Sequence, residues 1–389
     1  MPRTDHARPL PSRRLLPPVV LVVVLVVALV AGAAGCGGES AAQVDSTRTL
    51  RDALEQNLEE YPGVPGEAAA VLLPGERIEA AAGYADPDNA VPLTPDTPFR
   101  IASVTKTFVA VAALRLVEQG RLELDAPVGP LLDPGTATLL TDDGYDPDRI
   151  TVRMLLDHTA GLFDFAGSDA YDDVNTDDPG HRWTRAEQLR FAVDHGDPLA
   201  EPGAEYHYDD TGYLLVGEII ERIAGQPLPA AVRDLDDFDR LGLDHTWWET
   251  LEPAPTGEPA RAHQFAGPDF DNAVLDASAD LYGGGGMVST VGDVARFFAA
   301  LFSGRVFDHD STLDEMLTVS DPGRRAGAAL GIFATRIAGV RCWGHPGWWG
   351  TEAYHCPARN LTFALTVNQA DETLLDTRPV ARTILGLAR

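Results

Sequence analysis

A serine placed three residues before the only lysine of the chain is the first pair whose chemistry stands out. Ser103 and Lys106 form this pair, and arginine supplies every other basic side chain. Arginine replaces lysine as a surface charge, but its guanidinium does not release a proton at neutral pH, whereas an ammonium with a shifted pKa does. Residues i and i+3 share one helix face. The spacing therefore indicates a hydroxyl nucleophile activated by an amine.

The surrounding residues predict that Ser103 lies in the first turn of a helix. The sequence FRIASVTKTF leads into a run from Phe108 to Glu118 that is typical of a helix. The free N–H groups and the positive dipole end of a helix N-terminus stabilise negative charge. A nucleophile at this position is suited to a reaction in which an oxyanion develops.

Four further segments, in order along the chain, make the sequence resemble the serine penicillin-recognising hydrolases. That family includes class C β-lactamases, secreted D-alanyl-D-alanine carboxypeptidases, and related esterases and D-amino-acid peptidases. YDD at 208–210 is similar to the family's Tyr-x-Asn element, and HPG at 345–347 is similar to its Lys/His-x-Gly strand. LLDHTAGL at 155–162 and GGGGMVST at 283–290 resemble its connecting segments. The resemblance extends from about Glu67 to the C-terminal helix.

The resemblance implies a role for each matching residue. Ser103 would be the nucleophile, and Lys106 and Tyr208 would share the proton transfers of acylation and deacylation. An amine and a phenol suit that work only if their neighbours lower their pKa values. The backbone N–H groups of Ser103 and Trp348 would form the oxyanion hole, and His345 would be a polar or cationic group beside the tyrosine.

Three positions depart from the family pattern. Asp210 stands where asparagine is usual and adds a carboxylate near the lysine. Pro346 and Trp348 stand where carboxypeptidases and β-lactamases often place hydroxyls that bind a substrate carboxylate. We expect Gly347, Trp348 and Trp349 to contact the substrate, with the indoles as an apolar wall; two tryptophans buried in a hairpin are the alternative. These residues leave four substrate classes possible, namely an ester, an amide, a D-Ala-D-Ala peptide and a β-lactam.

Residues 1–36 resemble an export signal that ends in a lipobox. Four arginines precede the apolar run 19–30, and the small residues 31–35 lead directly to Cys36. In a bacterial lipoprotein such a thiol is acylated and becomes the mature N-terminus. Two alternatives stay open, namely simple secretion and a retained membrane anchor, for which the run is short against the roughly 20 residues that span a bilayer. All three predict an extracytoplasmic protein.

Cys342 and Cys356 are expected to form a disulfide, as is usual for an even number of remaining cysteines in an exported chain. If the turn of the intervening segment is centred near Trp349, the two cysteines face each other across an antiparallel hairpin. Two buried free thiols are the alternative.

The elements that must position these residues predict an α+β fold. One antiparallel sheet is expected from both chain ends, with strands at 68–73, 77–83, 328–336, 340–345, 352–356 and 361–368. A helix that starts at Ser46 or Thr47 and another at 374–387 would flank this sheet. The middle of the chain has helical runs such as 213–224, separated by loops rich in Asp, Gly and Pro. The elements predict a mainly helical domain inserted into the sheet domain, and the family resemblance implies that this is a β-lactamase/transpeptidase-like fold.

These elements predict the domain boundaries. We expect a signal peptide at 1–36, a linker at 37–45, a sheet domain formed by 46–108 and 290–389, and a mainly helical domain at 109–289.

Composition limits the partners. The chain carries 30 basic and 59 acidic residues, a net charge of -29, and such a surface repels phosphate backbones, so no nucleic acid is expected. Metal-ligand spacings such as CxxC or HxxxH do not occur, and no cofactor or metal is expected. The expected partners are a small-molecule or peptide substrate and a membrane, reached through the N-terminal lipid or anchor. We expect a monomer.

Two classes of function fit these observations. The first is an exported serine hydrolase that acts through a Ser103 acyl-enzyme on an ester, an amide or a D-amino-acid peptide. Within it, a D-alanyl-D-alanine carboxypeptidase and a class C-like β-lactamase are the alternatives. The second class is a non-catalytic penicillin-recognising surface protein. Retention of Ser103, Lys106 and Tyr208 favours the hydrolase.

Overall fold

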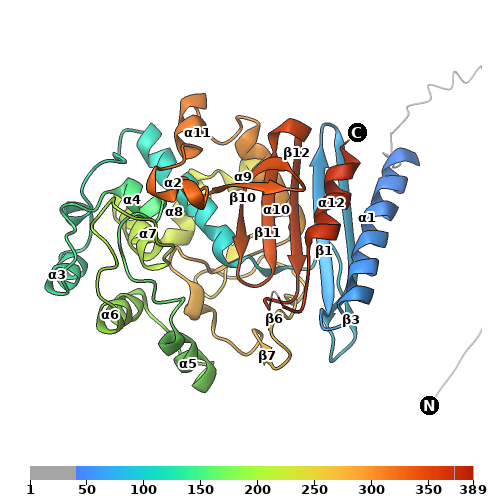
Figure 1. Cartoon of the computed structure of the whole chain (residues 1–389), viewed down its shortest axis with the longest axis horizontal. Coiled ribbons are helices and arrows are strands. Elements are labelled where there is room, and N and C mark those ends of the chain that lie inside the picture. The colour runs from blue at the N-terminus through green and yellow to red at the C-terminus, as the bar shows by residue number, and fades with distance from the viewer. Residues whose placement is uncertain (1–40, 372, 389) are drawn as a thin grey trace, which may run out of the picture. The chain divides into compact units, whose positions relative to one another are not determined.

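A seven-stranded antiparallel sheet dominates the computed structural model, which describes residues 41–371 and 373–388. Its order is β3-β2-β1-β12-β11-β10-β9, so strands from the two ends of the chain meet where β1 pairs with β12. The strands are β1 (Gly66–Leu73), β2 (Glu76–Asp86), β3 (Val91–Pro92), β9 (Phe333–Ile337), β10 (Val340–Gly347), β11 (Thr351–Cys356) and β12 (Leu361–Val367). The expected fold class is confirmed (Figure 1).

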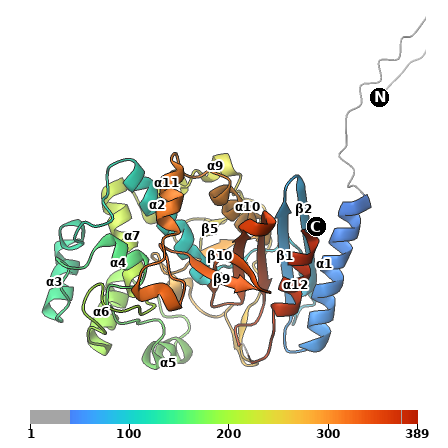
Figure 2. The same cartoon turned by 45° about the horizontal axis from the view of Figure 1, so that its top comes forward.

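Helices pack on both faces of this sheet. Side chains of β1 alternate between two cores, because successive residues of a strand point to opposite faces. Ala69 and Val71 pack with α1 (Ala41–Glu60) and α12 (Arg378–Leu387), which lie side by side in both views (Figure 1; Figure 2). The side chain of Ala68 points to the opposite face and packs in the core that contains α10 (Val291–Phe302).

The chain between β3 and α10 is mainly helical. Its helices are α2 (Thr105–Glu118), α3 (Pro134–Asp142), α4 (Val152–Leu156), α5 (Asp169–Asp177), α6 (Arg185–His195), α7 (Thr211–Ala224), α8 (Leu228–Leu235) and α9 (Phe238–Leu241); α11 (Asp310–Met316) follows α10. Phe108 of α2 stacks on Phe297 of α10 with 3.7 Å between ring centroids. One hydrophobic core thus continues from the helices to the sheet, and the domain boundaries at 109 and 290 stay a prediction.

Short strands connect this helical part to the segment that carries Ser103. β4 (Phe99–Arg100), β8 (Met287–Ser289) and β5 (Trp247–Trp248) form a sheet of order β4-β8-β5. β6 (Phe265–Ala266) pairs with β7 (Phe270–Asp271).

Several expected boundaries were wrong, and three of them differ by four residues or more. α1 begins at Ala41 rather than at Ser46, so residues 41–45 of the expected linker are helical, as the strong helix propensity of alanine and glutamine allows. β9 begins at Phe333 rather than at 328, because Gly331 adopts a φ of 69° and turns the chain before the strand starts. α12 begins at Arg378 rather than at 374. The expected signal peptide and the lipidation of Cys36 lie outside the described residues.

The disulfide between Cys342 and Cys356 is present, as expected. β10 and β11 pair with Gly347 opposite Thr351 and Trp343 opposite His355, so the turn lies where the spacing of the cysteines predicts it. A bridge that closes a loop of this length contributes roughly 3 kcal/mol by restricting the unfolded chain. Among the described residues, none of the helices combines the length and the apolar character that a membrane span needs.

Candidate active site

Ser103 lies where a short strand turns into a helix. β4 ends at Arg100, a 3-10 turn covers Ala102–Val104, and α2 begins at Thr105. Ala102 has a φ of 45°, in the left-handed region that a residue with a Cβ rarely adopts. The predicted first helical turn is therefore present, but it is a 3-10 turn. It places Ser103 in the wall of a cavity of about 1040 Å³.

Lys106 is fully buried behind Ser103. Its Nζ atom donates to Ser103 Oγ at 2.9 Å and to the carbonyl oxygen of Gly284 at 2.7 Å, and it forms an ion pair with Asp210. These contacts use all three protons of the ammonium. The segment GGGGMVST thus supplies a backbone acceptor that fixes the lysine, and Asp210 supplies its counter-charge.

The pKa of Lys106 is raised, as a carboxylate beside the ammonium predicts, whereas a proton acceptor for Ser103 needs a lowered pKa. Burial by itself lowers the pKa of this ammonium, but the charge of Asp210 opposes burial most strongly, followed by Tyr208 and Asp280. The net shift is upward, so Lys106 is charged at neutral pH. Only its small deprotonated fraction can accept the proton of Ser103.

Tyr208 lies beside the ammonium, with its ring centroid 5.1 Å from Lys106 Nζ. The imidazole of His158, from the segment LLDHTAGL, packs on the phenol with 4.4 Å between ring centroids. Burial raises the pKa of Tyr208, and the charge of Lys106 offsets only part of this rise. The phenol is therefore neutral at neutral pH and is placed to pass protons between Ser103 and Lys106.

Asp210 directly precedes α7, and its backbone N–H donates to Asp164 Oδ1 at 3.0 Å. Two further carboxyl groups, Asp209 and Asp280, lie near the same ion pair. Burial, together with the charge of Asp210, raises the pKa to about 7 for Asp164, about 8 for Asp209 and about 6 for Asp280. Sequence reasoning missed Asp164 and Asp280 as members of the site.

His345 lies in the expected place, in the cavity wall with its ring 6.2 Å from that of Tyr208, but it is not cationic. Burial lowers its pKa to about 3, and the charge of Lys106 acts in the same direction. Nδ1 donates to the carbonyl oxygen of Pro346 at 2.6 Å, whereas Nε2 has no hydrogen-bond partner among the described residues. The imidazole is therefore neutral and presents an acceptor nitrogen.

Gly347 lets the hairpin approach the nucleophile segment. A Cβ atom at this position would lie 2.5 Å from the carbonyl oxygen of Ile101 and 2.1 Å from Thr351 Oγ1, so no larger residue fits. The hydroxyl of Thr351 donates to the same carbonyl at 3.0 Å. These contacts hold β10 and β11 against the turn that carries Ser103.

The two tryptophans of the hairpin turn have different surroundings. Trp348 is 68% exposed and lines the cavity beside Ser103. Trp349 is buried and stacks on Phe270, outside the cavity lining, because the turn after Gly347 points it to the other side. The expected apolar wall of two indoles was therefore wrong for Trp349, and its alternative, a buried hairpin tryptophan, holds there.

The cavity beside Ser103 carries negative rather than positive charge. Glu352 and Asp371 belong to its described lining, which includes no arginine or lysine. Arg336 donates to the carbonyl oxygen of Gly339, and the guanidinium of Arg341 lies 4.9 Å from the ring of Trp343. Neither of these two arginines belongs to the described lining of the cavity.

Replacing Asp210 by asparagine should move the acid limb of the pH dependence of kcat/KM to lower pH by about one unit or more. Asp210 raises the pKa of Lys106, so its neutralisation lowers that pKa and enlarges the deprotonated fraction at neutral pH. The amide keeps the shape of the side chain. A pH–rate profile from pH 5 to 10 on wild type and Asp210→Asn compares the two curves. The range from pH 5 to 10 lies below the raised pKa of Lys106, so kcat/KM should rise with pH throughout it, and the curve of Asp210→Asn should lie on the low-pH side of the wild-type curve.

Asp236→Asn is the matched control, because Asp236 is a buried carboxyl whose pKa shift does not involve Lys106. Its profile should coincide with that of the wild type. An acid limb that stays in place in Asp210→Asn would show that the Asp210 charge does not control the proton acceptor of Ser103.

Comparison with known proteins identifies the family that shares this geometry. The β-lactamase family model matches residues 52–385. Esterase EstB of Burkholderia gladioli is 33% identical over 293 residues, which cover 68% of this chain and 71% of that protein. Penicillin-binding protein 4 of Amycolatopsis lactamdurans is 34% identical over 239 residues, or 60% of this chain and 58% of that protein.

Solved structures give the same result. The D-amino acid amidase from Ochrobactrum anthropi SV3, solved in complex with L-phenylalanine amide, has 28% identity and a TM-score of 0.72 over 88% of this chain and 98% of that one. The amidase thus shares this fold, and the esterase and the penicillin-binding protein resemble this sequence. With its family match over most of the length, the chain belongs to the β-lactamase family of serine hydrolases.

Proposed function

We propose that this protein is an exported serine hydrolase that forms an acyl-enzyme at Ser103 and acts on esters or amides without a carboxylate beside the scissile bond. The observation that carries the proposal is the bond from Lys106 Nζ to Ser103 Oγ at 2.9 Å, at the wall of a cavity large enough for a substrate. Two relatives support the choice of bonds, because one is named an esterase, EstB, and the other a D-amino acid amidase.

The proposed reaction begins with attack of Ser103 Oγ on the substrate carbonyl carbon. Its proton passes to the deprotonated fraction of Lys106, directly or through the Tyr208 phenol, and then to the leaving group as the ester or amide bond breaks. The backbone N–H groups of Ser103 and Trp348 stabilise the oxyanion. Water attacks the acyl-enzyme in the second half, gives its proton to the same groups, and releases the acid and Ser103.

Export is part of the proposal because the disulfide fits an oxidising compartment. Bridges such as Cys342–Cys356 persist outside the cytoplasm and are rare within it. The export signal expected in residues 1–36 agrees with this location, and acylation of Cys36 would tether the enzyme to a membrane.

The charge of the cavity supports the choice of substrate. The carboxylates of Glu352 and Asp371 line it, and the one lysine of the chain is paired with Asp210. A substrate carboxylate would meet the ionised Asp371 in a described lining that includes no arginine or lysine, and the hydroxyls that hold it elsewhere in the family are replaced by Pro346 and Trp348. A hydrogen bond to a charged group contributes about 1.5 to 3 kcal/mol, so losing two costs roughly two to four decades in kcat/KM.

We therefore expect 4-nitrophenyl butyrate to exceed both nitrocefin and a diacyl-D-Ala-D-Ala peptide at least tenfold in kcat/KM. All three substrates are measured on one preparation, and Ser103→Ala provides the background rate for each. If nitrocefin or the peptide exceeds the ester tenfold, the β-lactamase or carboxypeptidase alternative replaces this substrate class.

A variant that removes one negative charge from the cavity tests the effect of that charge with the same substrates. Asp371→Asn should raise the ratio of the nitrocefin rate to the ester rate, because it removes one carboxylate of the cavity lining. Asp314→Asn, on α11 and outside that lining, should leave the ratio unchanged.

A further inference from the structure

Gln264 is a fully buried glutamine whose side-chain amide has all of its hydrogen bonds satisfied. Oε1 accepts from the backbone N–H of Arg100 at 3.0 Å and from Asn272 Nδ2 at 3.3 Å. Nε2 donates to the carbonyl oxygen of Arg100 at 3.0 Å and to that of Trp349 at 3.1 Å. The amide therefore pairs with Arg100 as the backbone of a neighbouring strand would.

These bonds join the two segments that carry the proposed oxyanion-hole donors. Arg100 precedes Ser103 by three residues, and Trp349 directly follows Trp348. One nitrogen atom of Gln264 thus donates to a carbonyl of each segment. Because each donor N–H lies within three residues of a bonded carbonyl, a shift of Gln264 changes the distance between the two N–H groups.

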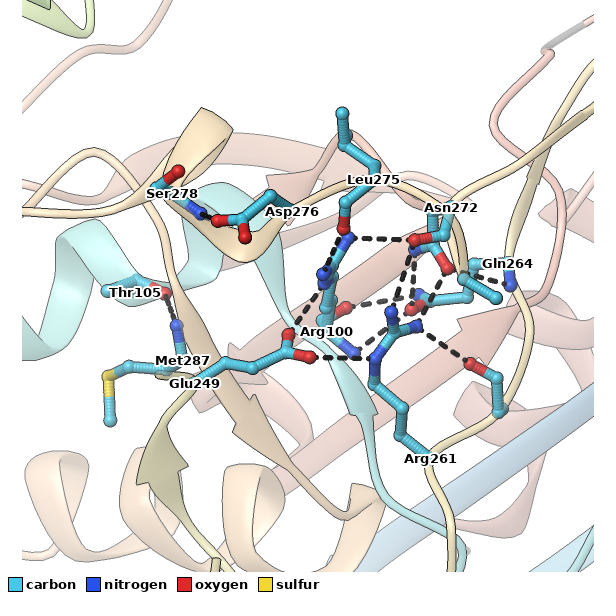
Figure 3. Close-up of polar contacts among 12 residues, drawn as sticks. Arg100, Thr105, Glu249, Arg261, Gln264, Asn272, Leu275, Asp276, Ser278 and Met287 are labelled. Carbon is cyan, nitrogen blue, oxygen red and sulfur yellow. Dashed lines mark hydrogen bonds and ion pairs between the residues drawn. The ribbon is translucent and has the colours of Figure 1, made fainter. Parts of the chain in front are cut away.

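The position of Gln264 is itself held by a dense polar network (Figure 3). Asn272 exchanges backbone and side-chain bonds with Gln264. The guanidinium groups of Arg100 and Arg261 both bond to the carbonyl oxygen of Asn272, and the carboxylate of Glu249 binds both arginines. Such a network of satisfied buried groups has few alternative arrangements, so it keeps the Gln264 amide in one place.

We infer that Gln264 is a positioning residue that sets the spacing of the two oxyanion-hole N–H groups. The inference rests on the proposed function, because the oxyanion hole belongs to that proposal. Gln264 contacts neither Ser103 Oγ nor Lys106 Nζ among its hydrogen bonds, and it acts through the backbone of Arg100 and Trp349. Its effect should therefore fall on the transition state rather than on substrate binding.

Gln264→Met tests this role, because methionine fills a similar volume and has no amide. We expect kcat for 4-nitrophenyl butyrate to fall about 10- to 100-fold with KM within about threefold, since removal of a whole oxyanion-hole donor costs about 10²- to 10³-fold. The rate of labelling by a fluorophosphonate should fall by the same factor. Gln188→Met is the matched control, a fully buried glutamine whose amide bonds to Tyr171 and Ser278.

The control separates positioning from general destabilisation. Gln188→Met also loses a buried amide, so it should lower the Tm comparably but keep kcat within about threefold of the wild type. A kcat loss in Gln264→Met no larger than that of Gln188→Met, or a change confined to KM, overturns the positioning role.

A second variant keeps the test decisive if Gln264→Met folds poorly. Gln264→Glu has the same shape and keeps the acceptor, but a carboxyl has at most one donor, whether protonated or ionised. It therefore cannot donate to the carbonyl oxygens of both Arg100 and Trp349, so we expect the same loss of kcat. Wild-type kcat in Gln264→Glu overturns the role. If the wild-type protein is not labelled at Ser103 at all, the proposed function fails, and the positioning role fails with it. If the wild-type protein is labelled normally and the rate of Gln264→Met is unaffected, only the positioning role is rejected.

Discussion

Ser103→Ala should lower kcat for every substrate by at least about 10⁴-fold, because no other group can form the acyl-enzyme. The fold should persist. Lys106 Nζ would lose one acceptor, Ser103 Oγ, but would keep Asp210 and the carbonyl oxygen of Gly284, so no buried charge is left unpaired. Steady-state kinetics and a thermal melt on the same preparation measure both quantities.

Ser289→Ala is the control for this prediction. Ser289 is buried on β8, where its hydroxyl bonds to Thr246, so its loss tests the effect of removing a buried serine hydroxyl. Its kcat should stay within about threefold of the wild type. Ser103 would be rejected as the nucleophile if Ser103→Ala kept more than about a hundredth of the wild-type kcat while Ser289→Ala lost kcat instead.

Lys106→Arg should lower kcat/KM by about 10²- to 10³-fold although it keeps the positive charge. A guanidinium does not release a proton at neutral pH, so it cannot accept the proton of Ser103, and general acid–base catalysis contributes a factor of this size. The ion pair with Asp210 would persist, so the loss reports the proton transfer. Retention of more than about a tenth of the wild-type value contradicts a role for Lys106 as a base.

Arg115→Lys gives the reciprocal control on the same helix. Arg115 lies in the last turn of α2 and pairs with Glu118 and Asp308, away from the cavity. A swap that conserves charge at this partly buried position outside the cavity lining should leave kcat/KM unchanged. Both variants must show a cooperative melt before their kinetics are compared.

The sequence predicted the parts of the site that depend on local motifs. Ser103, Lys106, Tyr208 and His345 come together in the structure because each lies on a segment whose spacing or resemblance marks it. The alternation of short apolar runs at both chain ends predicted the sheet, since strands bury one side chain in two. The cysteine spacing predicted the hairpin because antiparallel pairing places the two residues opposite each other.

What sequence reasoning missed depends on contacts between distant segments. The charge of His345 follows from its burial, which no local pattern reports. Trp348 and Trp349 are neighbours in a turn, where the alternation of a strand no longer tells which side chain faces the cavity. Gln264 and Asp280 lie between β5 and β8, in a stretch of loops with two short strands and a 3-10 turn, and only the fold brings them near the segment that carries Ser103. The HQF and SAD residues around them carry no recognisable motif.

Intact-protein mass spectrometry after treatment with a fluorophosphonate tests the central claim most directly. The probe reacts with an activated serine and needs no knowledge of the substrate. We predict one adduct per chain, mapped to Ser103 by peptide sequencing, absent in Ser103→Ala and present in Ser289→Ala. Two results would contradict the acyl-enzyme at Ser103. One is an adduct that persists in Ser103→Ala. The other is the absence of any adduct on folded wild-type protein, which would favour the non-catalytic surface protein.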